Sequence, residues 1–371
     1  MRIVHLVARS HRRGAEMVAM ELAEELDGRG HRNRVVALGL AHDGGRDPQL
    51  PPLVSRVSVG VDVLVADAWR LRRLLRSEPA DVVLAHGGWA VQVAAVATPR
   101  GGPAVVWQRI LGFPESVWRT GRRRWWQLVL RRVDAAVALT GDLEDELRRL
   151  GFAGPVWVIA NARRTDRFDA LDRDTESSWL RGRLGVAPDL PLIGFVGHLV
   201  DQKRPERAVE VLSRLHAMGR EAHLVVAGGG PLADALEREV RSRLLSDHVS
   251  LLGHRNDVER ILAGIDLLVL PSDHEGIPGV AIEAQMAGCP VVTFPLGGVG
   301  EVVDDGVTGI VLGDHDTATM AAEVSRLLGD PARRRRMSVA ARRRSARFSV
   351  GHTADAYEDR LGPREAPASS A

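Results

Sequence analysis

The sequence predicts an α/β protein built from two doubly wound, Rossmann-like halves, and three observations support this fold class. At 371 residues the chain is long for a single hydrophobic core. Short apolar runs alternate with helical stretches up to about residue 165, which is typical of a parallel sheet with helices on both faces. The alternation then restarts at residue 192, so we expect a second half of the same kind.

The elements of the first half follow from this alternation. Strands are expected at 3–7, 34–38, 81–85, 104–107, 135–139 and 156–159, and helices at 16–28 and 142–150. We therefore place an N-terminal Rossmann-like domain at residues 1–165. Residues 160–183 are polar and lack periodicity, so we interpret them as the linker between the domains.

The second half, residues 166–348, repeats the pattern. Strands are expected at 192–196, 224–227, 249–251, 267–270 and 291–294, and a clean amphipathic helix at 205–216. A further helical pattern occupies 349–361, and residues 362–371 have the composition of a disordered tail.

One stretch, residues 271–301, has the features of a ligand site. It follows the predicted strand at 267–270, so Glu275 lies in the loop where that strand ends. Pro278 suits the first position of a helix, and Gly288 suits its end. The stretch therefore predicts a helix that begins at the carboxyl end of a buried strand.

The start of this helix is suited to an anion. Its first N–H groups, over residues 276–280, have no partner within the helix, and the helix dipole adds a partial positive charge. A phosphate fits such a position. Glu283 lies about one and a half turns into the helix, and its side chain leans back toward the N-terminus. Two carboxylates, Glu275 and Glu283, would thus flank one anion site.

The composition excludes several classes of protein. No apolar run approaches the ~20 residues of a membrane span, and the chain starts with a strand rather than a secretion signal. The single cysteine, Cys289, excludes an internal disulfide and fits a reducing cytoplasm. A net charge of only +2 does not favour nucleic acid as a partner.

Lys203 is the only lysine among the 50 basic residues. In a chain that uses arginine almost everywhere, a retained lysine indicates a position that needs a compact point charge, such as a phosphate contact. It follows the strand at 192–196, in the loop that begins with Gly197 and His198. A second glycine-rich loop, residues 228–231, follows the next strand and suggests a phosphate or base loop, although a simple turn explains it equally well.

Residues 271–301 strongly resemble the donor-binding segment of the retaining glycosyltransferases of family 4, which have the GT-B fold of two Rossmann-like domains that face each other across a cleft. The shared residues are Glu275-Gly276-Ile277-Pro278, Glu283-Ala284, Ala287-Gly288, Pro290-Val291-Val292, Gly297-Gly298 and Glu301. The resemblance implies transfer of a sugar from a nucleotide-diphosphate sugar to an acceptor, with no cofactor and no metal.

The resemblance also implies roles for single residues on the donor side. Lys203 would bind the diphosphate, Glu275 the sugar hydroxyls and Glu283 the ribose. His198 departs from the family's arginine, so a protonated histidine or a nearby arginine has to supply that charge. The remaining donor-binding candidates are Arg204, Gly230, Arg255, Gly276, Ile277, Pro278, Gly279, Gly297 and Gly298.

The acceptor side is less well defined by the resemblance. Gly14 would let the backbone approach the reaction centre. The histidine that the family often has after its fourth strand is absent, and Gln108, Arg109 or His86 is expected to fill its place, with His86 as a catalytic candidate. The acceptor is unidentified and could be lipid-linked, a polysaccharide or a secondary metabolite.

A basic segment, residues 119–132, suggests a peripheral membrane contact from the cytoplasmic side. It contains six arginines and no acidic residue, and Trp125 and Trp126 adjoin the basic cluster. A basic helix with tryptophan at its rim suits anionic headgroups. The alternative is that both tryptophans are core residues surrounded by solvated arginines.

Two other functions remain open at this point. The same fold hosts nucleotide-sugar epimerases, and the departure at His198 is also compatible with a nucleotide-sugar binding protein without activity. The Asp172-Arg173-Asp174 sequence spells a metal motif of another glycosyltransferase fold, but no strand precedes it and we interpret it as chance.

Overall fold

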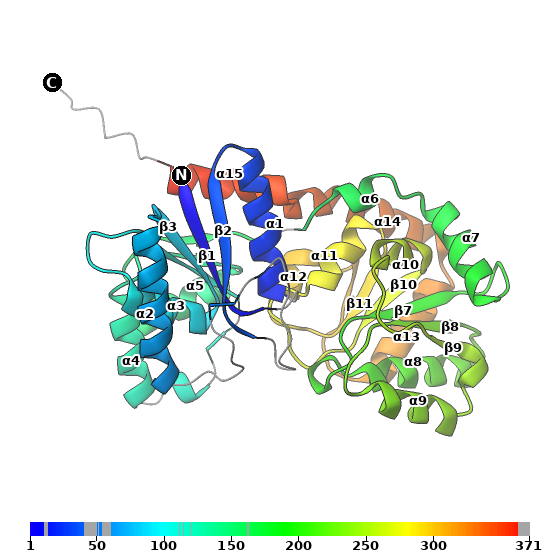
Figure 1. Cartoon of the computed structure of the whole chain (residues 1–371). Helices are drawn as coiled ribbons and strands as arrows, with labels where there is room; N and C mark the ends of the chain where they lie inside the picture. The colour runs from blue at the N-terminus through cyan, green and yellow to red at the C-terminus, as the bar shows by residue number, and fades with distance from the viewer. Residues whose placement is uncertain are drawn as a thin grey trace. The chain divides into compact units, whose positions relative to one another are not determined.

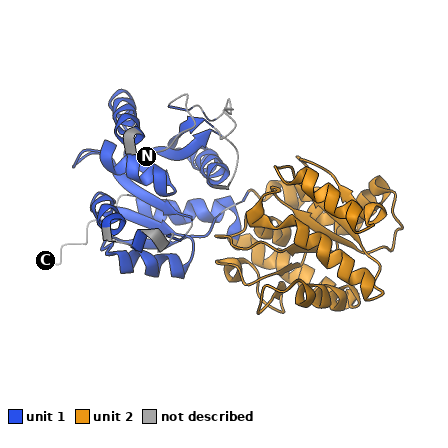
Figure 2. Ribbon diagram, turned by 90° about the horizontal axis from the view of Figure 1, so that it is seen from below, with its two compact units in different colours: residues 1–163, 348–371 blue, residues 164–347 orange. Residues whose placement is uncertain are grey.

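The computed structural model describes residues 1–10, 14–40, 50, 52–53, 61–110, 112–113, 115–118, 120–161 and 163–362. The chain divides into two compact units, shown in different colours in Figure 2. Unit 1 comprises Met1–Arg163 together with the segment from Phe348 onward, and unit 2 comprises Arg164–Arg347. The expected boundaries, at 165/166 and 348/349, differ from these by two residues and one residue.

Unit 1 contains a six-stranded parallel sheet in the order β2-β1-β3-β4-β5-β6 (Figure 1). All six expected strands are present, and several are longer than predicted. Their bounds are β1 Arg2–Ser10, β2 Arg32–Leu40, β3 Val82–His86, β4 Ala104–Arg109, β5 Ala135–Ala138 and β6 Val156–Val158. Near-continuous burial along β3 and β5 explains their apolar runs, because a central parallel strand is covered on both faces.

Helices connect these strands, as the crossover rule for parallel sheets requires. They are α1 Gly14–Gly28, α2 Val61–Ser77, α3 Gly88–Ala97, α4 Thr120–Leu130 and α5 Gly141–Leu150, with a short 3-10 turn at Glu115–Trp118. Thr140 accepts a hydrogen bond from the Leu143 amide as the N-cap of α5, and Gly151 ends that helix in the left-handed conformation.

The C-terminal helix α15, Val350–Leu361, belongs to unit 1 and packs on α1. Arg29, just after α1, donates to Glu358, at 2.8 Å, and to the Gly351 carbonyl, at 2.9 Å. His31 lies 2.7 Å from the same Glu358 carboxylate. The contacts with His31 and Arg29 hold the pKa of Glu358 below its usual range. The described end of the chain thus completes the first unit.

Unit 2 has a second six-stranded parallel sheet in the order β12-β11-β10-β7-β8-β9. Five of its strands were predicted: β7 Leu192–Val196, β8 His223–Ala227, β9 Val249–Leu251, β10 Leu267–Leu270 and β11 Val291–Thr293. The sixth, β12 Gly309–Val311, is short and was not anticipated. Gly309 is needed there, because a Cβ atom would lie 2.3 Å from the Val291 carbonyl oxygen.

Nine helices accompany this sheet in unit 2, whose residues are all described. They are α6 Asp166–Asp169, α7 Arg173–Leu184, α8 Pro205–Ala217, α9 Ala233–Ser242, α10 Val258–Gly264, α11 Gly279–Met286, α12 Val299–Val302, α13 Thr317–Leu328 and α14 Pro331–Ser345. The amphipathic helix expected at 205–216 is α8.

The interpretation of residues 160–183 as a linker is wrong, because α6 and most of α7 fall within it. Asp172 caps α7 by accepting from the Thr175 amide at 2.9 Å, and Leu180 is fully buried where α7 packs on α10. The sequence pattern did not predict this helix, because two of its three buried side chains, those of Glu176 and Arg181, are charged. Asp172 therefore has a structural role as a helix cap.

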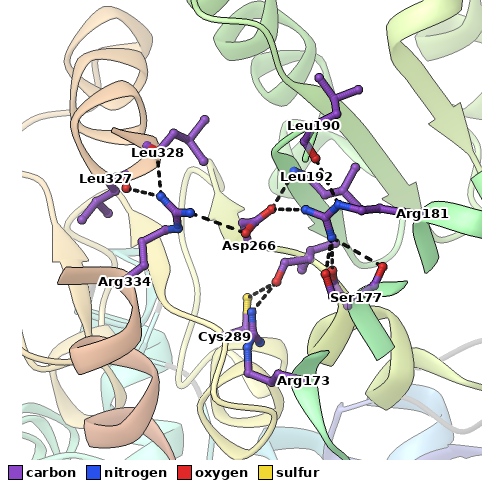
Figure 3. Close-up of polar contacts among 12 residues, drawn as sticks. Arg173, Ser177, Arg181, Leu190, Leu192, Asp266, Cys289, Leu327, Leu328 and Arg334 are labelled. Carbon is purple, nitrogen blue, oxygen red and sulfur yellow. Dashed lines mark hydrogen bonds and ion pairs between the residues drawn. The ribbon is translucent and has the colours of Figure 1, made fainter. Parts of the chain in front are cut away.

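Polar contacts of α7 belong to a network at the amino ends of β7 and β10 (Figure 3). The Asp266 carboxylate, just before β10, accepts from the Leu192 amide at 2.8 Å and from Arg181 at 2.7 Å. Arg173 donates to the carbonyls of Ile265 and Ala287. The network ties α7 to the amino ends of β7 and β10, which fixes the two strands that position the donor side.

The strand orders locate one switch point in each sheet. In unit 2, β7 lies between β8, the next strand along the chain, and the later strand β10. In unit 1, β1 likewise lies between β2, the next strand along the chain, and β3. Ligands of open α/β sheets bind at the carboxyl ends of the strands at such points. The loops after β7 and β10 in unit 2, and the ends of β1 and β3 in unit 1, are therefore the expected positions of ligand-binding residues.

Candidate functional site

The loops after β7 and β10 bring Lys203 and Glu275 together. Lys203 ends a short 3-10 turn, Asp201–Lys203, and its ammonium forms an ion pair with the Glu275 carboxylate. Ser272 donates its hydroxyl hydrogen to the same carboxylate at 2.9 Å. The Lys203 side chain is 21% exposed and that of Glu275 only 9%, so the pair is largely desolvated. Two residues predicted from separate motifs are thus direct neighbours.

A second set of contacts joins the same two loops. Asp273 accepts from Arg204 and Arg207 at 2.7 Å each, and these guanidinium groups hold its pKa below the usual range. The Gln202 side chain donates to the His274 carbonyl at 2.7 Å, and the Asp273 amide donates to the Gln202 carbonyl at 3.0 Å. Because Arg204 already neutralises Asp273, it is a weak substitute for the arginine missing at His198.

Three predicted glycines allow the surrounding loops to approach each other. Gly230 has a φ of +155°, and a Cβ atom there would lie 2.5 Å from the Leu199 carbonyl oxygen. Gly298, in the left-handed conformation, would meet the Gly276 carbonyl oxygen at 2.6 Å, and Gly297 would meet that of Glu275 at 3.1 Å. The Gly297-Gly298 turn is therefore packed directly on the backbone of the Glu275 loop.

Helix α11 begins at Gly279, one residue later than predicted, because Pro278 is its N-cap and not its first helical residue. Its end is as predicted. The amide of Gly288 donates to Gln285, and that of Cys289 to Ala284, while Gly288 adopts a φ of +67°. Burial raises the pKa of the Cys289 thiol to about 11, so this cysteine is an inert filler.

The start of α11 has the properties that the sequence predicts. Its first N–H groups, with Gly276 and the buried Ile277 just before them, have no acceptor within the helix. Glu283 lies on the same helix and is half-buried. The Lys203–Glu275 pair, the packed glycines and a helix N-terminus therefore share the carboxyl edge of one sheet.

Two other donor-side candidates, His198 and Arg255, lie in the loops after β7 and β9. His198 is half-buried in the loop after β7, next to Leu199, whose amide donates to the Gly229 carbonyl at 3.0 Å. Arg255 forms a two-pronged ion pair with Asp257, at 2.8 and 2.6 Å, in the loop after β9. That contact raises the pKa of Arg255 and already satisfies part of its guanidinium.

In unit 1, the switch point between β1 and β3 holds a buried chain of polar side chains. His86, at the end of β3, contacts His5 of β1 at 3.2 Å through one ring nitrogen and the Gln108 side chain through the other. His5 in turn contacts Asn33 at 3.0 Å, and Asn33 donates to Asp27 at 2.9 Å. The sequence analysis missed His5 and Asn33.

Burial keeps both histidines of this chain neutral. His86 is 2% exposed and His5 fully buried, and their rings stack with centroids 5.4 Å apart. Burial lowers the pKa of His5 to about 4, and burial together with the charge of His5 lowers that of His86 to about 3. His86 is thus enclosed in the protein rather than open to solvent at the end of its strand.

Arg109 is also buried, beside Gln108 at the end of β4. It pairs with Glu146 of α5, and its guanidinium lies 3.8 Å from the centroid of the Phe113 ring. Burial lowers its pKa to about 10, against the opposing effect of Glu146. Gly14 opens α1, but residues 11–13 before it lie outside the described residues.

The basic segment at 119–132 separates into two faces; its first residue, Arg119, is not described. From Thr120 it forms α4, where the Trp126 ring stacks on Trp107 at 5.3 Å and therefore belongs to the core. Trp125 is 36% exposed and donates its indole hydrogen to Gln92. The prediction of two rim tryptophans is therefore half wrong, because helical periodicity turns adjacent side chains to different surroundings.

Two doubly wound sheets, with polar side chains gathered at both switch points, define a two-domain α/β protein of the nucleotide-binding type. Residues 180–344 match the family described as glycosyl transferases group 1, and residues 12–167 match glycosyltransferase family 4. Together the two matches support a family 4-like glycosyltransferase of the GT-B fold, the family that residues 271–301 resemble.

Several relatives of this chain are named as glycosyltransferases. The alpha-D-kanosaminyltransferase of Streptomyces kanamyceticus is 32% identical over 61% of this chain and 59% of its own length. The 2-deoxystreptamine glucosyltransferase of the same organism is 29% identical over 76% and 78%. The D-inositol 3-phosphate glycosyltransferase of Nocardia farcinica is 35% identical over 47% and 41%. The match thus spans about half the length of two of these three relatives.

Solved structures share the fold at low identity. A glycosyltransferase from Rickettsia africae has a TM-score of 0.81 at 16% identity, with 97% of both chains covered. Anabaena HepE, solved in complex with UDP-glucose, has a TM-score of 0.80 at 19% identity, with 97% of this chain and 99% of HepE covered. Within the described residues, no helix is both long and apolar enough to span a membrane.

Proposed function

We propose that the protein is a glycosyltransferase that moves a sugar from a nucleotide-diphosphate sugar to an acceptor, with retention of configuration and without a metal ion. The observation that carries this proposal is the Lys203–Glu275 ion pair at the switch point of unit 2, beside the N-terminus of α11. Retention is the mode of the family. A structure of a related fold, Anabaena HepE, contains UDP-glucose, which is a donor of the proposed class.

The chemistry of the donor explains why these groups suffice. When the sugar leaves, negative charge develops on the departing diphosphate, and catalysis requires donors already aimed at that charge. The Lys203 ammonium and the first N–H groups of α11 supply a cation and fixed dipoles. Glu283 would hold the ribose, as the family places it.

The contact between Lys203 and Glu275 suggests how the donor is received. Without ligand, each group neutralises the other in a site that is mostly out of water. A diphosphate offers the ammonium a stronger anionic partner, which releases the Glu275 carboxylate to accept hydrogen bonds from sugar hydroxyls. Ser272 keeps the released carboxylate in place, since its hydroxyl donates to the same carboxylate.

The acceptor is assigned only by class. Two relatives are named for kanosamine transfer and for glucose transfer to 2-deoxystreptamine, and a third for D-inositol 3-phosphate. These names favour a small polyhydroxylated molecule, such as a secondary metabolite. In unit 1, Gln108 and Arg109 at the end of β4 stay the expected acceptor-side residues, although both side chains are buried and already paired with His86 and Glu146.

We further propose that unit 1 can rest on an anionic membrane surface at the cytoplasmic side, which would admit a lipid-linked acceptor. Arg122, Arg123 and Arg124 are exposed on α4, next to the exposed side chains of Trp125 and Leu128. Trp69 on α2 is 61% exposed, and α2 and α4 both pack on α3. Cations and exposed tryptophan on neighbouring helices suit a headgroup layer.

The experiment that tests the proposed function is incubation of the purified protein with a panel of nucleotide-sugars, with and without EDTA. The proposal predicts slow release of a nucleoside diphosphate from one donor, unchanged by EDTA, because no group of the site requires a cation. An epimerase would convert the sugar without release, and a binding protein would do neither. Turnover that disappears in EDTA and returns with Mn²⁺ would contradict metal independence.

A further inference from the structure

A groove on unit 2 lies away from the donor-side residues. It has a volume of about 1060 Å³ and is lined by the turn before β12 and by one face of α14. Thr308 in its wall immediately precedes β12, so the groove lies at the amino edge of the sheet. Glu275 and the start of α11 lie at the carboxyl edge. The groove is therefore separate from the site described above.

The lining residues of α14 follow a single helical stripe with a regular order of chemistry. Arg335 and Arg336 lie at one end, Val339 and Ala340 in the middle, and Arg343 and Arg344 at the other end. Residues at spacings of three, four, seven and eight share one face of a helix. The rise per residue places the two arginine pairs about 12 Å apart along the axis.

Within the described residues, three of the four arginines that line this groove lack a carboxylate partner, unlike several arginines elsewhere in unit 2. Arg204, Arg207, Arg241 and Arg243 each pair with a carboxylate within 3 Å. Arg335, Arg336 and Arg343 have no such partner among the residues that the structure describes. Only Asp304 brings a negative charge into the lining, where it lies 3.5 Å from Arg344. The groove thus has an excess of unneutralised cations.

The floor of the groove exposes apolar side chains. Val339 on α14 is 49% exposed and Val307 in the turn is 50% exposed. Pro331, Ala332 and Ala340 complete the apolar part of the lining. Exposed apolar groups between cations are suited to a ligand with an apolar body and charged ends.

We propose that this groove binds a small organic dianion, with an aromatic or apolar body and phosphate-like groups at both ends. Arginine is suited to such groups because its planar guanidinium donates two parallel hydrogen bonds to them. The groove volume is of the order of small-molecule sites, which are about 300–1,000 Å³. The apolar centre favours a molecule with a body rather than a bare phosphate.

Arg344 connects the groove to the donor side of the same unit. Its guanidinium donates to the Val302 carbonyl at 3.2 Å and to the Glu301 carbonyl at 3.4 Å, at the end of α12. The N-cap of α12 is Gly298, which packs on Gly276. A ligand that draws Arg344 into the groove would loosen α12 and change donor affinity. This coupling rests on the proposed function, whereas binding in the groove does not.

The test of binding uses bis-ANS, a fluorescent aromatic disulfonate whose sulfonates stand in for phosphates. We expect Arg335→Ser with Arg343→Ser to weaken the saturable fluorescence signal by at least tenfold in Kd. The matched control, Arg241→Ser with Arg243→Ser, removes the same charge from exposed positions at the C-terminal end of α9 and should leave the Kd unchanged. Equal Kd values in wild type and groove variant would overturn the proposal.

Two further measurements separate the other interpretations. Tighter retention of the wild type than of the groove variant on phosphatidylglycerol vesicles, without any difference in bis-ANS affinity, would show a lipid surface and overturn the small-ligand proposal. Bis-ANS should lower the affinity for the nucleoside diphosphate of the active donor in the wild type and not in the groove variant; equal effects in both contradict the coupling through Arg344. Absence of binding of any nucleoside diphosphate in every variant would count against the proposed function and not against the groove.

Discussion

Lys203 and Glu275 are in contact, and the roles proposed for them predict opposite effects of substitution on nucleoside diphosphate binding. Lys203→Ala removes the cation that meets the diphosphate, so affinity should fall by at least tenfold. Glu275→Gln removes a competitor for the same ammonium, so affinity should stay the same or rise. Calorimetric titration with the diphosphate of the active donor measures both. A strong loss in Glu275→Gln with none in Lys203→Ala would reverse the assignments.

His5 and His86 predict how unit 1 responds to acid. Their folded pKa values, about 4 and about 3, lie below the usual value of 6.5, so the unfolded chain binds protons first as the pH falls. The free energy of unfolding of unit 1 is therefore undiminished by these histidines above pH 6.5, and it declines as the pH falls below that value. At pH 5 the expected loss is about 2 kcal/mol per histidine.

Urea unfolding followed by tryptophan fluorescence measures this decline, since seven of the eight tryptophans belong to unit 1. His86→Gln removes one of the two titrating groups, so the loss of unfolding free energy between pH 7 and pH 5 should shrink by about half. An equal loss in wild type and variant would mean that the acid sensitivity arises elsewhere.

At the scale of elements, the turn before α12 depends on backbone geometry that only glycine allows without strain. Gly298 has a φ of +68° and no room for a Cβ atom beside Gly276. Gly298→Ala should therefore cost about 1–2 kcal/mol in the free energy of unfolding, and it should also weaken donor binding because it displaces the Glu275 loop. Thermal denaturation and diphosphate titration report the two effects.

Gly300→Ala is the matched control, because the space around Gly300 in the same helix is open. That substitution should leave donor affinity unchanged. Equal behaviour of the two variants would show that the close approach of the Gly297-Gly298 turn to the Glu275 loop is unimportant for the site.

Helix α4 carries the membrane proposal, which co-sedimentation with vesicles tests. Binding should occur on anionic and not on neutral vesicles, and should fade at high salt because each cation contributes about 1 kcal/mol near the surface. Arg122→Glu with Arg123→Glu should abolish it, and Trp125→Ala should reduce it. Arg241→Glu with Arg243→Glu controls for charge alone. Lack of binding to anionic vesicles at low salt would return α4 to an ordinary structural role.

At the scale of the whole molecule, the two sheets could be predicted because buried parallel strands leave short apolar runs in the sequence. The helix at 173–184 could not, because two of its arginines, Arg173 and Arg181, bond to a carbonyl and a carboxylate far along the chain. Such contacts produce no periodic apolar pattern.

The candidate residues of unit 2 and of unit 1 also differ in how well the sequence predicts them. Glu275 and Lys203 were found because a motif and a unique residue mark them, and both lie in loops at strand ends. His5 lies inside a strand, where a single polar residue in an apolar run gives no signal of its partner. Its link to His86 depends on the pairing of β1 with β3, which brings together residues 81 positions apart.

The central claim is that Lys203 stabilises a departing diphosphate in a sugar transfer that needs no metal. The most direct measurement is the rate of nucleoside diphosphate release from the active nucleotide-sugar, in EDTA, by the wild type and by Lys203→Ala. Loss of one stabilising charge predicts a rate lower by roughly 10²–10³ in the variant. A variant that turns over at the wild-type rate, or a wild type that releases no diphosphate from any nucleotide-sugar, would contradict the account.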